Sequence, residues 1–200
     1  MKKITFFVFV LVAMLLVSCG SSKSGTSNPY GKEMVLTESE AYALQKPGKR
    51  AAGKGESYDE SAARQLAELD ARATFSNALA SAIVSAAKKS NVDITQYAGS
   101  TTDGMTATDG GGQANTMAKS ISTNIIKNTN IVKVNKFFGN NRVYTIFVCL
   151  EYIGEIEDMA KEAAQQVKQR VSDEDRAKIQ YELEKFEKEI KNDLINNMRK

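Results

Sequence analysis

Few side chains in this sequence have the types that enzymes use for catalysis. Its 200 residues include no histidine and no tryptophan, so the commonest general base and the commonest transition-metal ligand are both missing. Two carboxylate pairs, Glu155 with Asp158 and Glu68 with Asp70, could act as a general acid and base. Each pair lies on or at the start of an expected helix, where carboxylates usually cap the helix or face solvent. We therefore expect no catalytic residues and no enzymatic activity.

Two other stretches have some features of ligand sites. Gly53 and Gly55 flank Lys54, but a phosphate-binding loop needs a longer glycine loop ending in Gly-Lys-Ser/Thr, and the dinucleotide motif needs a third glycine. Asp103 and Asp109 lie in a glycine-rich stretch, without the alternating acidic pattern or the closing glutamate of a calcium loop. We expect neither a cofactor nor a metal. The net charge of +3 gives no basic surplus for binding nucleic acid.

The beginning of the chain has the pattern of an export signal. Lys2 and Lys3 precede an unbroken apolar run, Ile4 to Val17, and small residues follow it. The run has about fourteen residues, whereas a membrane-spanning helix needs about twenty. A cleaved signal is therefore favoured over a permanent anchor.

The end of this signal resembles the bacterial lipobox. In Leu16-Val17-Ser18-Cys19 an aliphatic and a small residue precede a cysteine. The resemblance implies cleavage before Cys19 and attachment of a diacylglyceryl group and a further acyl chain such as palmitate, enough for stable anchoring in a membrane. Gly20 is not aspartate and the continuation is not acidic, so we expect an outer-membrane lipoprotein that faces the periplasm.

The second cysteine, Cys149, is expected to be a packed free thiol. A lipidated Cys19 cannot form a disulfide with it, and no histidine is present to activate it as a nucleophile.

Composition divides the chain into four segments. We expect a signal peptide over residues 1–18, a flexible tether over 19–37, an α+β domain over 38–154 and a helical extension over 155–200. Serine, glycine and asparagine dominate the first part of the tether, which is too polar to pack.

The domain is organised around a long alanine-rich helix expected over residues 61–89. Asp59 or Ser57 could cap it, and its apolar residues fall on two stripes. We therefore expect it to be covered by a sheet on one side and by helices on the other. The first stripe comprises Leu66, Leu69, Ala73, Ala80, Val84 and Ala87, and the second comprises Phe75, Ala78, Leu79, Ala82, Ile83 and Ala86.

The rest of the domain reads as a loop, a helix and a hairpin. Residues 99–113 are glycine-rich and expected to be a loop or disordered insert, and residues 114–128 favour a helix, with a strand over 121–126 as the alternative. Residues 131–138 and 143–152 alternate as strands around the turn at 139–142. Val132, Val134 and Phe138 are expected to share one face of the first strand. In the second strand, Tyr144, Ile146, Val148, Leu150 and Tyr152 share one face and Thr145, Phe147, Cys149 and Glu151 the other.

Two further helices are expected in the extension. One carries Ile156, Ala160, Ala163, Val167 and Val171, and the last, capped at Ser172, carries Ile179, Leu183, Phe186, Ile190 and Leu194. We interpret the last helix as folded back on the domain; the alternatives are an arm that docks a partner and a seam for self-assembly.

The order of these elements resembles the LPP-twenty lipoprotein family, whose domain is similar to the N-terminal module of flagellar assembly protein T. The resemblance rests on Arg50-Ala51-Ala52-Gly53-Lys54-Gly55, on Ala62-Ala63-Arg64 and Asp70-Ala71-Arg72, and on the strand ending Val148-Cys149-Leu150. It implies an α+β fold with the long helix and a second helix packed on a small antiparallel sheet. It also makes residues 49–55 a first strand, where composition alone indicates a loop.

The resemblance further implies an envelope protein without enzymatic activity, in a family associated with surface structures or flagellar rings. The expected function is binding or scaffolding, with an envelope protein or a second copy as partner and the membrane reached through the lipid. A self-assembling structural component is the alternative, and an enzyme is the least favoured class.

Overall fold

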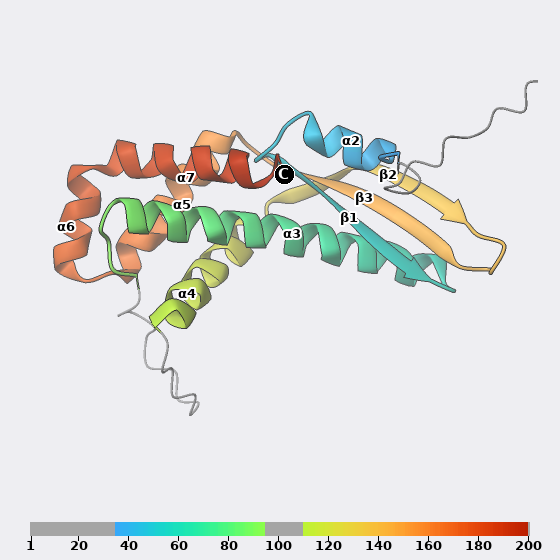
Figure 1. Cartoon of the computed structure of the whole chain (residues 1–200), viewed down its shortest axis with the longest axis horizontal. Coiled ribbons are helices and arrows are strands. Elements are labelled where there is room, and N and C mark those ends of the chain that lie inside the picture. Colours follow the sequence, from blue (N-terminus) through green and yellow to red (C-terminus); the bar gives the residue numbers. More distant parts are fainter. Residues whose placement is uncertain (1–34, 95–109, 200) are drawn as a thin grey trace, which may run out of the picture. The chain divides into compact units, whose positions relative to one another are not determined.

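The structure, a computed structural model, has the predicted α+β fold (Figure 1). It describes residues 35–94 and 110–199. Residues 1–34, which hold the expected signal and most of the expected tether, lie outside the described ranges. The described residues from Leu36 onward form one compact unit by their contacts. Its elements are α2 (Glu38–Leu44), β1 (Arg50–Ser57), α3 (Glu60–Lys89), α4 (Gly110–Ile125), β2 (Thr129–Phe138), β3 (Tyr144–Tyr152), α5 (Ile156–Arg170), α6 (Asp173–Tyr181) and α7 (Leu183–Asn197).

The sheet has three antiparallel strands in the order β1-β3-β2, so the last strand in sequence lies in the middle. Strands β2 and β3 form the predicted hairpin. Strand β1 pairs along the whole of its length with β3, from Arg50 opposite Glu151 to Ser57 opposite Tyr144. The strand that only the family resemblance indicated is therefore present, and the composition-based expectation of a loop was wrong.

A β-bulge in β2 changes which residues face the long helix. Ile131 pairs with Leu150, but Cys149 pairs with Lys133, so Val132 is the extra residue. The expectation that Val132 and Val134 share a face was wrong, because the bulge moves Val132 out of the alternation. Ile131 and Val134 pack against the core of the sheet instead, while Val132 is 39% exposed.

Strand β1 packs on α3 through small residues only. Ala63, Ala67 and Ala71 recur every four residues on one face of α3 and are fully buried. Gly53 and Gly55 lie against this alanine row. A Cβ atom built on Gly53 would lie 2.5 Å from the carbonyl oxygen of Ala67 and 2.7 Å from the Cα of Ala71. Glycine is required at both positions because the strand and helix backbones touch.

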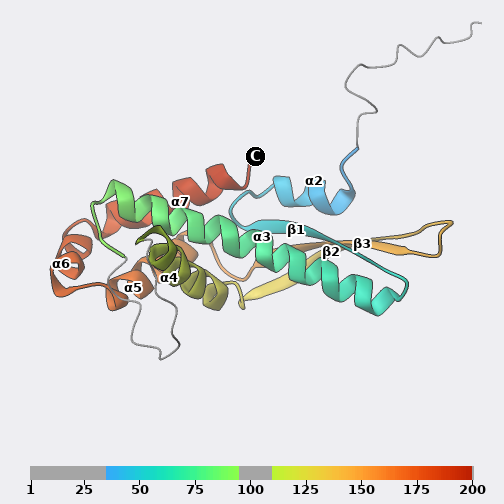
Figure 2. The same cartoon turned by 60° about the horizontal axis from the view of Figure 1, so that its bottom comes forward.

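The sheet and the other helices divide α3 along its length. Its first half packs on the sheet, and its second half lies among α4, α5, α6 and α7 (Figures 1 and 2). A sheet and helices both cover α3, as expected, but they follow each other along the helix instead of lying on its two sides. Two residues of the first predicted stripe, Leu66 and Leu69, are 46% and 65% exposed, because the small alanine row takes the sheet side of α3.

The second half of α3 belongs to a ring of four helices. Helix α3 contacts α4 and α7, and α5 contacts the same two neighbours. Their apolar faces enclose one core, whose largest members are Phe75, Leu79 and Ile83 on α3, Ile121 and Ile125 on α4, Met159 on α5, and Phe186, Ile190 and Leu194 on α7. The interpretation of the last helix as folded back on the domain is confirmed. The chain breaks that helix at Glu182 into α6 and α7, where one helix was expected.

The remaining boundaries follow local signals. Asp59, not Ser57, caps α3, since its side chain accepts a hydrogen bond from the Ala62 amide at 2.7 Å. Helix α4 begins at Gly110, so the last residues of the predicted 99–113 loop are helical; residues 95–109 lie outside the described ranges. The strand alternative for 121–126 was wrong, because Ile121 and Ile125 lie four residues apart on the buried face of a helix.

Helix α2 covers the face of the sheet opposite α3. The hydroxyl of Ser39 donates to the Asn135 side chain of β2 at 2.7 Å. The guanidinium of Arg50 in β1 donates to the Tyr42 carbonyl at 3.1 Å and lies 3.7 Å from the centre of the Tyr42 ring. The sheet thus has helices on both faces at its Arg50 end.

Candidate functional site

The predicted lipidation residue, Cys19, lies outside the described residues. The structure therefore gives no geometry for it. The candidate catalytic and ligand-binding residues lie within the described ranges, apart from Asp103 and Asp109. Each can be followed to the contacts it makes.

The carboxylate pairs serve in capping and ion pairing. Asp158 accepts a hydrogen bond from the backbone amide of Glu155 at 3.1 Å, at the start of α5, and Glu155 pairs with Lys49 at 3.0 Å. Two residues apart on α3, Glu68 and Asp70 engage different partners. Glu68 pairs with Arg72 at 2.8 Å, and Asp70 accepts from the Lys54 backbone amide at 2.9 Å.

The glycine-flanked lysine is part of the packing of β1. Gly53 and Gly55 pair with Val148 and Ile146 in the ladder with β3, and the Lys54 amide donates to Asp70, so these residues form a strand and not a phosphate cradle. The ammonium of Lys54 lies on the face of the strand opposite the glycines and pairs with Glu56 at 2.8 Å. Within residues 35–94 and 110–199, no three His, Cys, Asp or Glu side chains gather in a way that could hold a metal ion.

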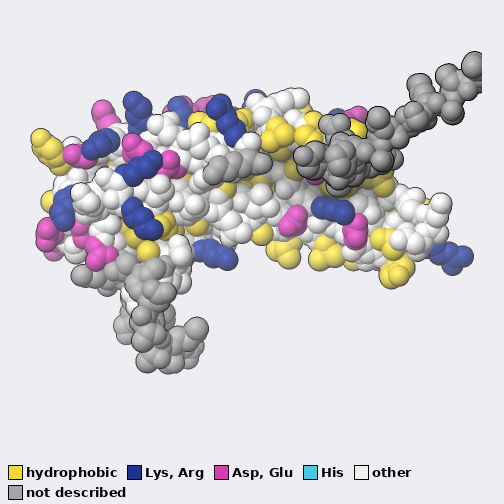
Figure 3. Space-filling model, viewed as in Figure 1, with side chains coloured by type: hydrophobic (Ala, Val, Ile, Leu, Met, Phe, Trp, Pro, Cys, Tyr) yellow, Lys and Arg dark blue, Asp and Glu magenta, His cyan; other side chains and the backbone are white. Residues whose placement is uncertain are grey.

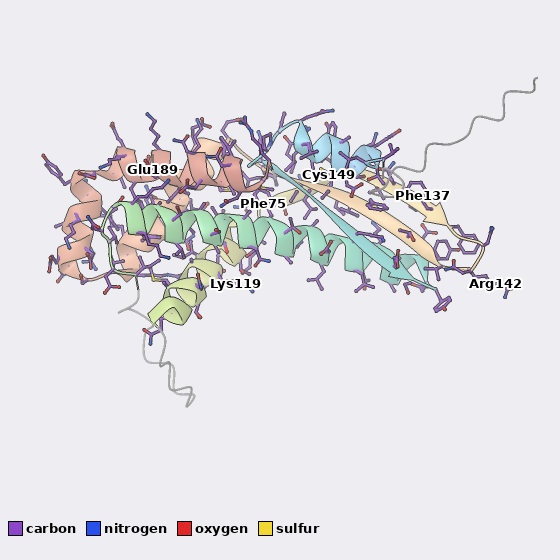
Figure 4. All side chains as sticks on the ribbon, viewed as in Figure 1. Phe75, Lys119, Phe137, Arg142, Cys149 and Glu189 are labelled. Atoms are coloured by element: carbon purple, nitrogen blue, oxygen red, sulfur yellow. The ribbon has the colours of Figure 1, made fainter. Side chains whose placement is uncertain are left out.

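Cys149 is fully buried on β3, on the same face as Arg50 and Glu151. Burial raises the pKa of its thiol to about 11; the Glu151 carboxylate adds to this rise, and Arg50 opposes it. The thiol is therefore protonated at neutral pH and is a poor nucleophile. Figure 4 shows it inside the fold, at the level of the sheet.

One buried ion pair was not found from the sequence. Arg50, only 5% exposed, donates from Nε to Glu151 at 2.8 Å. Burial alone would raise the pKa of the Glu151 carboxyl, but hydrogen bonds and charge from Arg50 and Lys46 lower it overall. Sequence alternation placed Glu151 beside Cys149 but gave no signal that β1 would bring an arginine opposite it.

The concave feature with the most distinctive chemistry lies between α3 and α4, and we refer to it as the α3–α4 groove. It consists of two hollows of about 300 and 440 Å³ that share Asn77 and Lys119. Figure 4 shows Lys119 on α4 beside α3. The first hollow is lined by Leu69, Arg72, Ala73, Ser76, Asn77, Lys119, Thr123, Ile126 and Lys127, and the second by Asn77, Ala80, Ser81, Val84, Ser85, Lys88, Asn115 and Lys119.

The wall residues come from regular positions on both helices. On α3 the wall follows the first stripe predicted for the long helix, with its members Leu69, Ala73 and Ala80 and with Asn77 between them. On α4 the wall residues recur every four positions, at Asn115, Lys119 and Thr123. Beneath the groove the two helices are held together by a hydrogen bond of 2.9 Å between the buried hydroxyls of Ser76 and Ser122. The packing that closes the ring of helices thus leaves this part of the stripe open.

The sequence contains one signal for the groove, which is an uneven distribution of charge. Residues 110–150 contain no aspartate or glutamate, whereas they contain Lys119, Lys127, Lys133, Lys136 and Arg142. Two of these cations are neutralised by contacts with other elements, Lys133 by Glu38 at 2.8 Å and Lys136 by Glu60. Lys119 and Lys127, on the groove, make no ion pair with any described residue.

Two exposed aromatic residues lie at the hairpin end, on opposite faces of the sheet because they are consecutive in β2. Phe137 and Phe138 are 51% and 61% exposed and lie beside aromatic partners, Phe147 at 6.0 Å and Tyr144 at 4.7 Å between ring centres. Figure 3 shows that exposed hydrophobic side chains are scattered over the face in view. Neither residue lines any of the described cavities, so the hairpin end is a weaker candidate for a small-molecule site than the groove.

Comparison with known proteins adds no assignment: no protein-family model, no curated protein and no solved structure matches the chain. The fold itself defines a small α+β protein in which a three-stranded sheet and a four-helix ring share one long helix. None of the helices in the described ranges has the length and apolar character needed to cross a bilayer.

Proposed function

We propose that this chain is a lipid-anchored lipoprotein of the bacterial envelope that works by binding or scaffolding and catalyses no reaction. The observation that carries the proposal is the sequence around Cys19. A cationic start, a short apolar run and Leu16-Val17-Ser18-Cys19 follow in the order of a lipoprotein signal. The proposed location is the outer membrane, facing the periplasm, as a member of the LPP-twenty family.

The contacts of the candidate catalytic residues support a binding role. The carboxylates of the candidate acid–base pairs cap a helix, pair with cations or accept a hydrogen bond from a backbone amide, and the one described cysteine is protonated inside the fold. The partner is an envelope protein or another ligand, and the membrane is contacted through the acyl chains.

Self-assembly through the last two helices is less well supported. The residues that would form the seam, among them Val167, Phe186 and Ile190, are buried in the ring of helices. Association through that seam would require the ring to open, which would expose the main core of the unit.

The two cysteines allow a matched test of the anchor. Cells that make the full chain are fed an alkyne analogue of palmitate, and the chain is analysed for label and for intact mass. Cys19→Ala should abolish labelling and leave the leader uncleaved. Cys149→Ala, which removes the buried thiol, should leave labelling unchanged. A native mass that shows an unmodified Cys19 or an intact leader would refute the proposal.

A further inference from the structure

The α3–α4 groove is long and narrow. Its lining runs from Leu69 to Lys88 on α3, which is roughly 28 Å at about 1.5 Å per helical residue. Each hollow has the volume of a small-ligand site. An α-helix is about 10 Å across with its side chains, so a partner helix would lie over the groove without entering it. An extended chain fits the groove better.

The chemistry of the lining changes from one end of the groove to the other. The exposed surface at the Leu69 end is mainly apolar. Leu69, Ala73 and Ile126 line it, together with the polar side chains of Arg72, Ser76, Asn77, Lys119, Thr123 and Lys127. At the Lys88 end the polar share of the surface is larger, with hydroxyl, amide and ammonium groups from Ser81, Ser85, Asn77, Asn115, Lys88 and Lys119 beside Ala80 and Val84. A molecule with a hydrocarbon body and a polar head matches this gradient.

The charge of the lining specifies the head. Among the residues that the structure describes, no aspartate or glutamate lines either hollow. Arg72 is already paired with Glu68, and its guanidinium also donates to the Ile126 carbonyl at 3.2 Å. Lys88, Lys119 and Lys127, in contrast, make no ion pair with any residue in the described ranges. Two of these ammonium groups, those of Lys88 and Lys119, line the hollow with the more polar surface, and ammonium groups without carboxylate partners favour an anionic head.

We propose that the α3–α4 groove binds a fatty carboxylate, with its hydrocarbon chain at the Leu69 end and its head between Lys88 and Lys119. A carboxylate fits better than a phosphate because, of the described residues, neither an arginine fork nor the amides of a helix N-terminus line the Lys88 end. This assignment rests on the proposed binding role and names its ligand.

The test uses the full chain in isolated membranes, where no detergent competes for the groove. A diazirine-bearing palmitate is added, the sample is irradiated, and the modified peptides are mapped by mass spectrometry. Label is expected in the peptides that contain residues 69–88 and 115–127. The corresponding alcohol, which partitions into the same membranes but lacks the charge, is expected to label these peptides about tenfold less, the factor that one charge-assisted hydrogen bond provides.

Two charge-reversal variants distinguish binding in the groove from non-specific attraction of the fatty acid to surface lysines. Lys88→Glu/Lys119→Glu is expected to reduce the labelling of these peptides by about tenfold or more. Lys161→Glu/Lys188→Glu makes the same change of net charge at two exposed lysines outside the groove lining and is expected to have no effect. Ala73→Phe, which fills the exposed floor at the Leu69 end, should also suppress labelling, and circular dichroism verifies that each variant is folded.

Three results would overturn the assignment: equal labelling by the acid and the alcohol, equal labelling of the two charge-reversal variants, or label that avoids the groove peptides. A photo-crosslinking amino acid at position 73 that captures a protein in place of the fatty acid would also overturn it, in favour of a docking role. The anchor is scored separately, by the mass at Cys19, so its failure and the failure of the groove are distinguishable.

Discussion

Gly53→Ala is expected to destabilise the fold more than any single methyl group added at the surface. The new Cβ would meet the Ala67 oxygen at 2.5 Å and the Ala71 Cα at 2.7 Å, whereas ordinary contacts begin at 3.4 Å. Strand and helix must therefore separate by roughly an ångström along a fully buried row. Overpacking of a core costs about 1–3 kcal/mol. Because the obstructing atoms are backbone, we expect a loss of about 3 kcal/mol or more, a large part of the 5–15 kcal/mol that stabilises a typical domain.

The backbone origin of this clash can be tested by a failed rescue. Ala67→Gly removes the methyl group of Ala67 but leaves the Ala67 oxygen in place, so the double variant should be no more stable than Gly53→Ala. Gly112→Ala is the matched control. It lies in α4, where a Cβ would meet nothing within 4 Å, and the gain in helix propensity should stabilise the fold by up to about 1 kcal/mol.

The assay is urea unfolding of the purified variants, followed by far-ultraviolet circular dichroism. The two glycine-to-alanine changes should shift the midpoint in opposite directions. A Gly53→Ala variant with the midpoint of the native chain would refute the close approach of β1 to α3. Rescue by Ala67→Gly would show that a side chain, not the helix backbone, limits the approach.

Two further expectations concern titrating groups on the other face of the sheet. Cys149 should resist thiol reagents in the folded chain at pH 8 and react only when the chain unfolds. Folding raises the pKa of its thiol from 9.0 to about 11, so above pH 9 the thiol loses its proton in the unfolded chain before it does so in the folded chain. The free energy of unfolding should therefore fall as the pH rises above 9. Fast labelling without unfolding would contradict this burial. Glu151→Gln should cost about 1–3 kcal/mol near neutral pH because Arg50 loses its charged partner. Since the pKa of Glu151 is lowered from 4.5, the stability it provides is present above that pH and lost as the pH falls through the lowered value. Acid unfolding should therefore be less steep in Glu151→Gln than in the native chain; identical acid profiles would show that the pair contributes nothing.

Periodicity predicted the elements that bury large apolar side chains. The long helix, the hairpin and the helical extension were found because residues such as Phe75, Val148 and Phe186 recur at the spacing of a helix face or a strand face. The boundaries agree to within a few residues at most of these elements. The start of α4 was missed because its first turn is a run of glycines, which carries no apolar pattern.

The features that were mispredicted depend on contacts between distant segments. Strand β1 has almost no large side chains, because its partner is a row of alanines on α3, and composition alone then resembles a loop. The bulge at Val132 shifts the alternation of β2 by one residue, and this shift is visible only in the pairing with β3. Leu66 and Leu69 are apolar yet exposed, since the alanines beside them take the sheet side.

The candidate groove could have been inferred only in part. The absence of acidic residues over 110–150 is visible in the sequence and marks a surface of one charge sign. Its placement beside the open part of the α3 stripe depends on how α4 crosses α3, which no local pattern specifies. The proposal that Cys19 is lipidated, in contrast, rests on the sequence alone.

The order of strands in the sheet has a consequence for biogenesis. Both edge strands pair with β3 and not with each other, and β3 is made after them. A chain that has emerged only as far as Asn141 can form α3 but has no partner for either β1 or β2. About ninety residues separate β1 from the strand that completes it, and closing such a loop is slow compared with forming a local hairpin. Until Tyr152 is free, two unpaired edges stay exposed, and this is the interval in which a holding chaperone would be most useful.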